Sequence, residues 1–270
     1  MRIQLENVSF TYPSGVAALQ NVSLAIESGE SVAILGENGA GKTTLAKHLN
    51  GLLKPDQGRV SIGDWDTSDH TVAELARRVG YVFQNPDEQL FERSVRREVA
   101  FGPRNLGRSE AEIEESVRRA LARVDLEAQA DTHPYDLHAS QRKLVALAAT
   151  LALDTSILIL DEPTTGQDAQ GVRRVQSILS ELKQEGRTLV AISHDVDFCV
   201  ENFERVVLMS EGRVLADGDA AEVLSQKELL SEAAVEAPQL LRLADVLQLP
   251  GSPRTVGEFV DHLERRREER

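Results

Sequence analysis

The sequence predicts an α/β protein built around a central, mostly parallel sheet. Three short runs of consecutive apolar residues, typical of strands buried on both faces, carry this prediction: Val32–Leu35, Ile157–Leu160 and Leu189–Ile192. Helical apolar spacing follows the first run and recurs in later parts of the chain. With 270 residues, 41% of them hydrophobic, the chain is long enough for one or two domains with a sizeable core.

The loop after the first run carries a phosphate-binding pattern. Residues 36–44 read G-E-N-G-A-G-K-T-T, which matches G-x-x-x-x-G-K-[ST] between a strand and a helix. The glycines let several N–H groups point at one anion, and the helix N-terminus adds its positive dipole end. Lys42 is expected to reach the β- and γ-phosphates of a nucleotide, and the Thr43 hydroxyl to bind Mg²⁺. The expected nucleotide-binding residues of this loop are Gly36, Asn38, Gly39, Ala40, Gly41, Lys42, Thr43 and Thr44.

Polar side chains follow three further predicted strands at their carboxyl ends, where open α/β sheets bind ligands. Asp161 and Glu162 end a buried run, and such a pair is costly to bury without a cation or hydrogen bonds. Asp161 is therefore expected to hold Mg²⁺, and Glu162 to polarise the water that attacks the γ-phosphate. Gln84 ends the predicted strand 79–83 and is placed to contact Mg²⁺ or that water. His194 can reach a γ-phosphate, although a lone histidine is more often structural or solvated.

The remaining chain divides into recognisable segments. Alternating residues over 3–12 and 22–26 predict an antiparallel edge beside the strand of the phosphate loop. Between about 86 and 150 helical patterns replace the βα rhythm, which predicts an inserted helical subdomain. One of its helices opens with a Ser109–Glu112 capping box, and a second, apolar-faced helix runs from Gln141 onward. Strands over 206–209 and 213–216 are expected to form a hairpin. Residues 1–218 thus form the main domain, and 219–270 a helical extension with a possible role in self-association.

Composition excludes some classes of function. The formal net charge of −14 disfavours a dominant electrostatic grip on nucleic acid. A single cysteine, Cys199, rules out an intrachain disulfide framework and fits a reducing compartment. No stretch approaches the roughly 18 apolar residues needed to span a bilayer, so a membrane role is expected to come through a partner.

Taken in order, the phosphate loop, Gln84, the segment 137–141, Asp161-Glu162 and His194 resemble the ATPases of ABC transporters. The resemblance covers residues 2–218 and implies a P-loop NTPase core with an antiparallel β edge and an inserted helical subdomain. It implies Asp161 as the Walker B ligand, Glu162 as the catalytic glutamate and His194 as the switch histidine. Gln84 becomes the Q-loop residue. The implied D-loop is 165–168, including Gly166 and Asp168.

Tyr12 ends the first predicted strand just before a loop, where its ring could stack on a nucleotide base. From spacing alone, a half-buried structural tyrosine is the preferred interpretation, because aromatic residues are common in strands. The resemblance reverses this preference and implies that Tyr12 stacks on the adenine of ATP.

A finer resemblance lies in V-F-Q-N-P-D-E-Q-L-F at 82–91, V-A-F-G-P at 99–103 and F-T-Y-P at 10–13. These stretches, with the C-terminal extension, are similar to the ATPases of energy-coupling-factor importers, which take up vitamins or cobalt and nickel ions. The resemblance implies a second ABC ATPase subunit, a transmembrane coupling protein and a separate substrate-binding membrane component. It places the chain at the cytoplasmic face of the cell membrane. The implied docking surface for the coupling protein includes Asn85, Pro86, Gln89 and Phe91.

One segment departs from the family pattern. The signature, usually L-S-G-G-Q, is here Leu137, His138, Ala139, Ser140 and Gln141. In ABC dimers it contacts the γ-phosphate bound to the opposite subunit through a serine hydroxyl and glycine amides. Imidazole replaces that hydroxyl here, and two added Cβ atoms stand where close backbone approach is required. We therefore hypothesise a heterodimer with two unequal ATP sites, while a homodimer, or His138 acting as the phosphate donor, stays open.

Two hypotheses from other classes compete with transport. A nucleotide-dependent clamp on DNA or ribosomes would need a long coiled-coil insertion or two cores in one chain, and the acidic balance also disfavours a nucleic-acid partner. A binding module that senses ATP without turnover is suggested by the altered signature. Glu162 argues against it, because a sensor does not need a positioned base.

Overall fold

The structure is a computed structural model that describes residues 1–249 and 251–268. Its larger sheet has the strand order β10-β9-β3-β8-β7-β6, with all neighbours parallel except β10, which is antiparallel to β9. These strands are β3 (Ser31–Leu35), β6 (Val79–Val82), β7 (Ile157–Asp161), β8 (Thr188–Ile192), β9 (Arg205–Ser210) and β10 (Arg213–Asp219). Every residue of β3, β7 and β8 is buried, which explains their continuous apolar runs and confirms the predicted α/β class.

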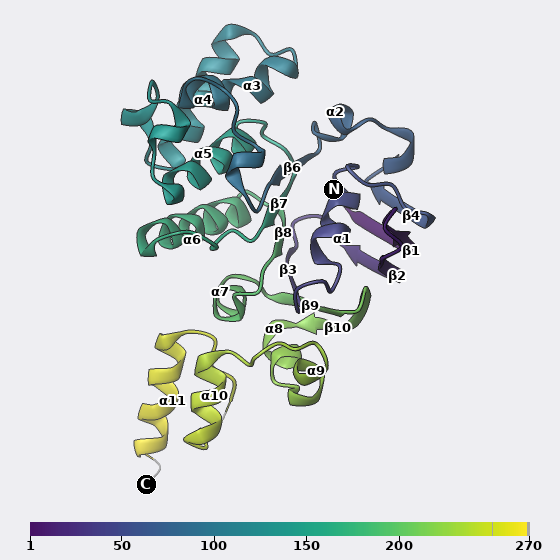
Figure 1. The fold of residues 1–270 in the computed structure, drawn as a ribbon. Coiled ribbons are helices and arrows are strands. Elements are labelled where there is room, and N and C mark those ends of the chain that lie inside the picture. The colour runs from purple at the N-terminus through teal and green to yellow at the C-terminus, as the bar shows by residue number, and fades with distance from the viewer. Residues whose placement is uncertain (250, 269–270) are drawn as a thin grey trace.

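A second, antiparallel sheet has the order β2-β1-β4-β5. It consists of β1 (Ile3–Thr11), β2 (Ala17–Ile26), β4 (Gln57–Ile62) and β5 (Trp65–Asp66). The first two strands pair as predicted, but they do not lie beside the P-loop strand, whose neighbours are β8 and β9. The alternation of apolar and polar residues indicates that each strand has one buried face, but it does not specify which strand lies beside it. Helix α1 (Lys42–Leu49) contacts strands of both sheets, and its buried apolar residues share one hydrophobic core with them (Figure 1).

Three helices form a separate layer above the larger sheet: α3 (Val95–Asn105), α4 (Glu110–Arg123) and α5 (Ala139–Leu151). They are drawn in blue to teal at the top of Figure 1. The predicted capping box is present, with Ser109 and Glu112 bonding each other's backbone N–H groups. A 3-10 turn at Thr67–Asp69 precedes the short helix α2 (Val72–Leu75). Other 3-10 turns lie at Pro86–Glu88, Glu127–Gln129 and Pro134–Asp136.

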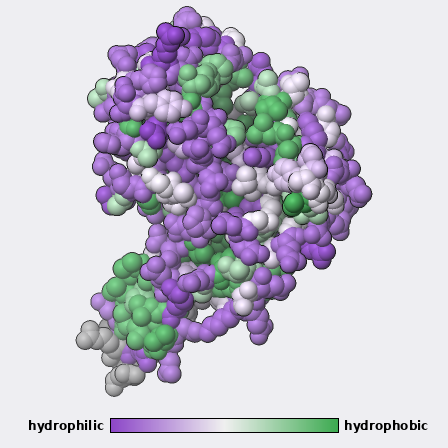
Figure 2. Space-filling model, viewed as in Figure 1, coloured by the Kyte–Doolittle hydropathy of each residue, from purple (hydrophilic) through white to green (hydrophobic). Residues whose placement is uncertain are grey.

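Helices α6 (Ala169–Gln184) and α7 (Val196–Asn202) follow β7 and β8, respectively. The chain ends in α8 (Ala220–Leu224), α9 (Lys227–Glu232), α10 (Gln239–Val246) and α11 (Val256–Glu268). Figure 2 shows a green, apolar surface at this C-terminal end, where Leu243, Val246, Val256 and Val260 are exposed. Arg254 links this end to α7, because its guanidinium donates to the carbonyl oxygens of Val200 and Phe203. Among the described residues, no helix is long and apolar enough to cross a bilayer.

Candidate nucleotide-binding and hydrolysis site

The order of the parallel strands gathers the predicted site residues at one edge of the larger sheet. The P-loop follows β3, His194 follows β8, Asp161 ends β7, and Gln84 lies two residues beyond β6. These strands are consecutive neighbours and parallel, so their carboxyl ends lie side by side. Residues from four distant parts of the sequence therefore meet at this edge, as expected for a ligand site in an open α/β sheet.

The backbone of the P-loop fits a phosphate group. Gly39 and Gly41 have φ values of +89° and +97°, which L residues rarely adopt. A Cβ atom on Gly41 would lie 2.4 Å from the carbonyl oxygen of Ala18, so no larger residue fits there without a shift. Lys42 is only 6% exposed, and its Nζ donates to the carbonyl oxygens of Gly36 and Glu37 at 2.8 and 2.9 Å. Burial lowers the pKa of Lys42, and an anion in the loop would supply the charge that this buried ammonium needs.

The surroundings of Asp161 fit a magnesium ion. Its carboxylate is 2% exposed and accepts hydrogen bonds from the Thr43 hydroxyl at 3.2 Å and the Tyr81 hydroxyl at 2.8 Å. Burial raises the pKa of Asp161, and a divalent cation bound beside it would stabilise its charged form. The Gln84 side chain is exposed at the end of the neighbouring strand and offers a further oxygen. Thr43, Asp161 and Gln84 together provide the hard oxygen ligands that Mg²⁺ prefers.

Glu162 is held in an unusual conformation. It is 5% exposed and has a φ of +51°, which is uncommon for a residue with a side chain. Its N–H donates to the carbonyl oxygen of Ile192 at 2.8 Å. One carboxylate oxygen lies 2.8 Å from Nδ1 of His194 and 3.4 Å from the Ser193 hydroxyl. The carboxylate is thus oriented by groups that follow β8, an arrangement suited to a general base whose position matters.

Two contacting residues were missed by sequence reasoning. Tyr81 lies in the predicted strand 79–83, whose pattern indicates only a strand. A buried tyrosine hydroxyl usually has a partner, and here that partner is Asp161. Lys143 lies in the helix predicted from Gln141 onward, whose apolar face gives no sign of a buried ammonium. Its Nζ donates to the backbone oxygens of Glu162 and Thr165. The side chain is 4% exposed, and burial lowers the pKa of Lys143 to about 8.

Tyr12 lies beside the P-loop helix. Its hydroxyl is 3.1 Å from the Thr44 hydroxyl, and its ring packs edge-on against Phe10 with ring centroids 4.9 Å apart. The ring is half-buried, so part of it remains accessible next to the loop. This position is compatible with base stacking and equally with a structural role.

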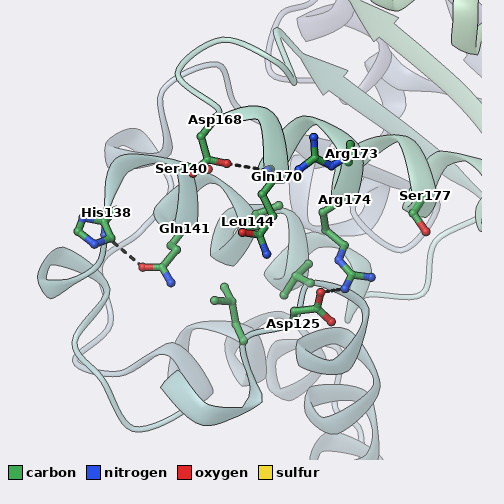
Figure 3. A pocket seen from close by; sticks show the side chains of 13 residues that line it. Asp125, His138, Ser140, Gln141, Leu144, Asp168, Gln170, Arg173, Arg174 and Ser177 are labelled. Atoms are coloured by element: carbon green, nitrogen blue, oxygen red, sulfur yellow. Dashed lines mark hydrogen bonds and ion pairs between the residues drawn. The ribbon is translucent and has the colours of Figure 1, made fainter.

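The signature segment 137–141 leads into α5 and borders a pocket of about 490 Å³ (Figure 3). His138 is exposed at the start of the helix, and its N–H donates to Oε1 of Gln141 at 3.4 Å. The Ser140 hydroxyl donates to Oε1 of Gln167 at 2.6 Å, which ties the segment to the predicted D-loop. Asp168 caps α6 through the N–H of Gly171, and Gly166 lies exposed before it with a φ of +75°. Leu137 is buried, whereas Ala139 is exposed.

The predicted docking residues differ in exposure. Asn85 is exposed, Pro86 is half-buried, and Phe91 is 61% exposed and packs edge-on against Phe101 at 4.7 Å. Gln89 instead points inward, where its amide nitrogen donates to the carbonyl oxygen of Ala146 at 2.9 Å. Its side chain therefore anchors the segment to α5.

Glu98, another residue that sequence reasoning missed, holds the same segment in place. It is 3% exposed, and its carboxylate accepts the N–H groups of Phe91 and Glu92 at 2.9 and 2.7 Å. Burial raises the pKa of Glu98. Arg142, in the first turn of α5, also pairs with Asp87 at 3.3 Å. The segment 85–91 is therefore attached to both α3 and α5.

Comparisons with known proteins agree with this geometry. The family model described as "ABC transporter" matches residues 19–165. The energy-coupling factor transporter ATP-binding protein EcfA of Methanothermobacter thermautotrophicus is 42% identical over 252 residues, covering 92% of this chain and 81% of its own length. The structure of CbiO1 from Clostridium perfringens, part of the ABC transporter complex CbiONQ, superposes with a TM-score of 0.76 and 36% identity, covering 92% of this chain and 98% of that one.

The dimeric ABC cassette MJ0796, solved in a post-hydrolysis state with ADP and phosphate, has a TM-score of 0.74 and 28% identity. It covers 81% of this chain and 98% of its own. Members of this family bind ATP, generally with Mg²⁺, and hydrolyse it to power transport. The P-loop, the buried acidic pair and these similarities establish that the chain belongs to the ABC transporter family, as one of its ATP-hydrolysing subunits.

Proposed function

We propose that the chain is an ATPase subunit of an energy-coupling-factor type importer that powers uptake of a vitamin or of a transition-metal ion such as cobalt or nickel. The observation that carries the proposal is the exposed Phe91–Phe101 pair on the helical layer, in a segment that follows Gln84 and whose backbone is held by Glu98. An exposed aromatic pair on a rigid support suits a docking surface for apolar helices. The names of EcfA and CbiO1, similar over most of the chain, support the same assignment.

In the proposed reaction, the N–H groups of the P-loop and Lys42 hold the β- and γ-phosphates of ATP, and Tyr12 stacks on the adenine. Mg²⁺, bound by Thr43, Asp161 and Gln84, would neutralise phosphate charge. Glu162 accepts the proton of the attacking water, a contribution worth roughly 10²–10⁴-fold in rate.

His194, the proposed switch histidine, contributes to the position of Glu162. Nδ1 of His194 lies 2.8 Å from the carboxylate of Glu162, so His194 orients the proposed base. Because its ring is largely exposed at the same edge of the sheet, it is also placed to approach the γ-phosphate.

Helix α5 provides a route by which hydrolysis acts on membrane partners. Its first turns contact the docking segment through Arg142 and Gln89, and the Glu162 backbone through Lys143. Closure of two ATPase subunits across ATP, and their reopening after hydrolysis, would move this helix relative to the larger sheet. We propose that Asn85, Pro86 and Phe91 pass this motion to a transmembrane coupling protein, while a separate membrane component binds the substrate.

We further propose that the two ATP sites are unequal and that the second ATPase subunit is a different protein. The side chains of His138 and Ser140 stand where the family signature has serine and glycine, and Ser140 is already bonded to Gln167. A site completed by this segment should hydrolyse ATP poorly, whereas the site built on this chain's own P-loop and Glu162 retains its groups. The triple variant His138→Ser, Ala139→Gly, Ser140→Gly tests this idea. Equal ATPase rates for homodimers of the unaltered chain and of the variant would contradict it.

The domain boundaries follow from the same proposal. Residues 1–218 form the ATPase domain, with the helical subdomain at about 86–150. Residues 219–270 form an extension whose apolar surface on α10 and α11 would contribute to dimerisation. The chain would lie on the cytoplasmic face of the membrane, attached through its partners, with no nucleic-acid partner.

Purification from native membranes tests the proposal directly. The tagged chain is extracted gently, and the proteins that co-purify in near-stoichiometric amounts are identified. A second ATPase with an intact signature, together with small multi-spanning membrane proteins, is the expected result, and the substrate-binding component would identify the cargo. Recovery from the soluble fraction with ribosomes, with DNA or alone would refute the transport assignment.

A further inference from the structure

We propose that Lys143 is a positioning residue for ATP hydrolysis, because its ammonium fixes the backbone of Glu162 to the helix that follows the signature segment. The inference rests on the proposed role of Glu162 as the general base. It adds a residue on α5, outside the P-loop and the strand ends, on which the geometry of that base depends.

The backbone of Glu162 needs such support. Glu162 has a left-handed backbone, which a residue with a side chain keeps only where several contacts from the surrounding structure hold it. Three groups of Glu162 are held: the N–H by the carbonyl oxygen of Ile192, the carboxylate by His194, and the carbonyl oxygen by Lys143. The first two contacts come from β8 and the residues after it. Lys143 supplies a contact from α5, a different layer of the fold.

Burying the ammonium of Lys143 costs free energy unless polar contacts compensate for its lost hydration. A 4% exposed ammonium loses its hydration, which explains its lowered pKa, and an apolar side chain would fill the same space without that penalty. The penalty is offset by two backbone carbonyl oxygens, those of Glu162 and Thr165, and by the nearby charges of Glu162 and Asp161. Both carbonyl groups belong to the loop that follows the Walker B strand, because Glu162 opens this loop and Thr165 is the first residue of the predicted D-loop.

A second bond ties the far end of the same loop to α5. The Ser140 hydroxyl donates to Gln167 at 2.6 Å, one turn of helix before Lys143. Figure 3 shows Ser140 next to Asp168 and Gln170 at the start of α6. The loop 162–167 is therefore held to the first turns of α5 at both ends. A displacement of the signature segment would be transmitted to the base of this chain's own site through Lys143.

Two substitutions at position 143 separate positioning from packing. Lys143→Met keeps the length and burial but removes the donors, whereas Lys143→Arg keeps a cation with several N–H groups. Each full-length variant is purified with its native partners, and MgATP hydrolysis and ATP binding are measured. We expect kcat to fall at least tenfold in Lys143→Met, because a shift of about 1 Å in a catalytic group can cost on the order of 100-fold. KM and the ATP affinity should stay within twofold, and Lys143→Arg should recover at least a third of the rate.

Lys183→Met is the matched control. Lys183 is half-buried, donates to the backbone oxygen of Asn202 and pairs with Glu204, but it lies near the end of α6. Its loss should lower stability without changing kcat, which shows what removing a lysine that donates to a backbone oxygen does by itself. A kcat for Lys143→Met within threefold of the unaltered protein would overturn the inference. So would parallel losses of kcat and ATP affinity in that variant.

Glu162→Gln distinguishes failure of this inference from failure of the proposed base. If Glu162→Gln leaves hydrolysis intact, the assignment of the base is wrong, and the role of Lys143 falls with it. If it abolishes hydrolysis while Lys143→Met does not, only the positioning role is refuted. A positioning residue acts through Glu162, so adding Lys143→Met to Glu162→Gln should cause no further loss of the residual rate.

Discussion

Replacing Gly41 by alanine should lower the free energy of unfolding by roughly 3 kcal/mol, through two separable costs. The first is conformational, because the φ of +97° at Gly41 lies in the left-handed region, which costs an L residue roughly 1–2 kcal/mol. The second is steric, because the new Cβ would lie 2.4 Å from the carbonyl oxygen of Ala18. A backbone oxygen cannot rotate away, and relieving overpacking of this kind costs about 1–3 kcal/mol.

Comparison with Gly39→Ala isolates the steric cost of Gly41→Ala. Gly39 is in the same loop with a φ of +89°, but among the described residues no atom lies within 4 Å of the position of its Cβ. This variant should therefore lose only the conformational part, roughly 1–2 kcal/mol. Urea unfolding of the two full-length variants, followed by circular dichroism, measures both values. Equal free energies of unfolding for Gly39→Ala and Gly41→Ala would refute the reasoning, since the contact with Ala18 would then carry no cost.

Three further predictions concern the magnesium ligand, the docking surface and the buried lysine. Tyr81→Phe removes a hydrogen bond to the charged Asp161, worth roughly 1.5 kcal/mol, so half-maximal hydrolysis should need about tenfold more Mg²⁺; an unchanged Mg²⁺ titration would contradict this. Phe91→Ser should reduce co-purification of membrane proteins while ATP binding is kept, whereas Val72→Ser, which changes an exposed residue elsewhere, should do neither. Burial lowers the pKa of Lys143 from 10.5 to about 8. Between pH 8 and pH 10.5, roughly, the unfolded chain therefore binds more protons at this group than the folded protein does. The free energy of unfolding contributed by this group should therefore rise with pH over that interval, and urea midpoints should show a smaller rise in Lys143→Met.

The sequence by itself determined the α/β class and the P-loop, because both depend on short-range patterns. Apolar runs of four residues mark strands buried on both faces, and the nine residues of the phosphate loop carry their own backbone requirement, visible as glycines with positive φ. The expectation that Asp161, Glu162, Gln84 and His194 would converge also came from the sequence, since carboxyl ends of parallel strands share one edge.

Only the tertiary structure decided the contacts made across elements. The first two strands belong to a second sheet, because alternation records a buried face without naming the element packed on it. Gln89 points inward to α5, and Tyr81 and Lys143 reach the acidic pair from β6 and α5, although their local patterns indicate only an ordinary loop, strand and helix. These pairings join residues that lie 19 to 80 positions apart in the chain. They exist because packed layers bring polar groups together in a dry interior, where each must find a partner.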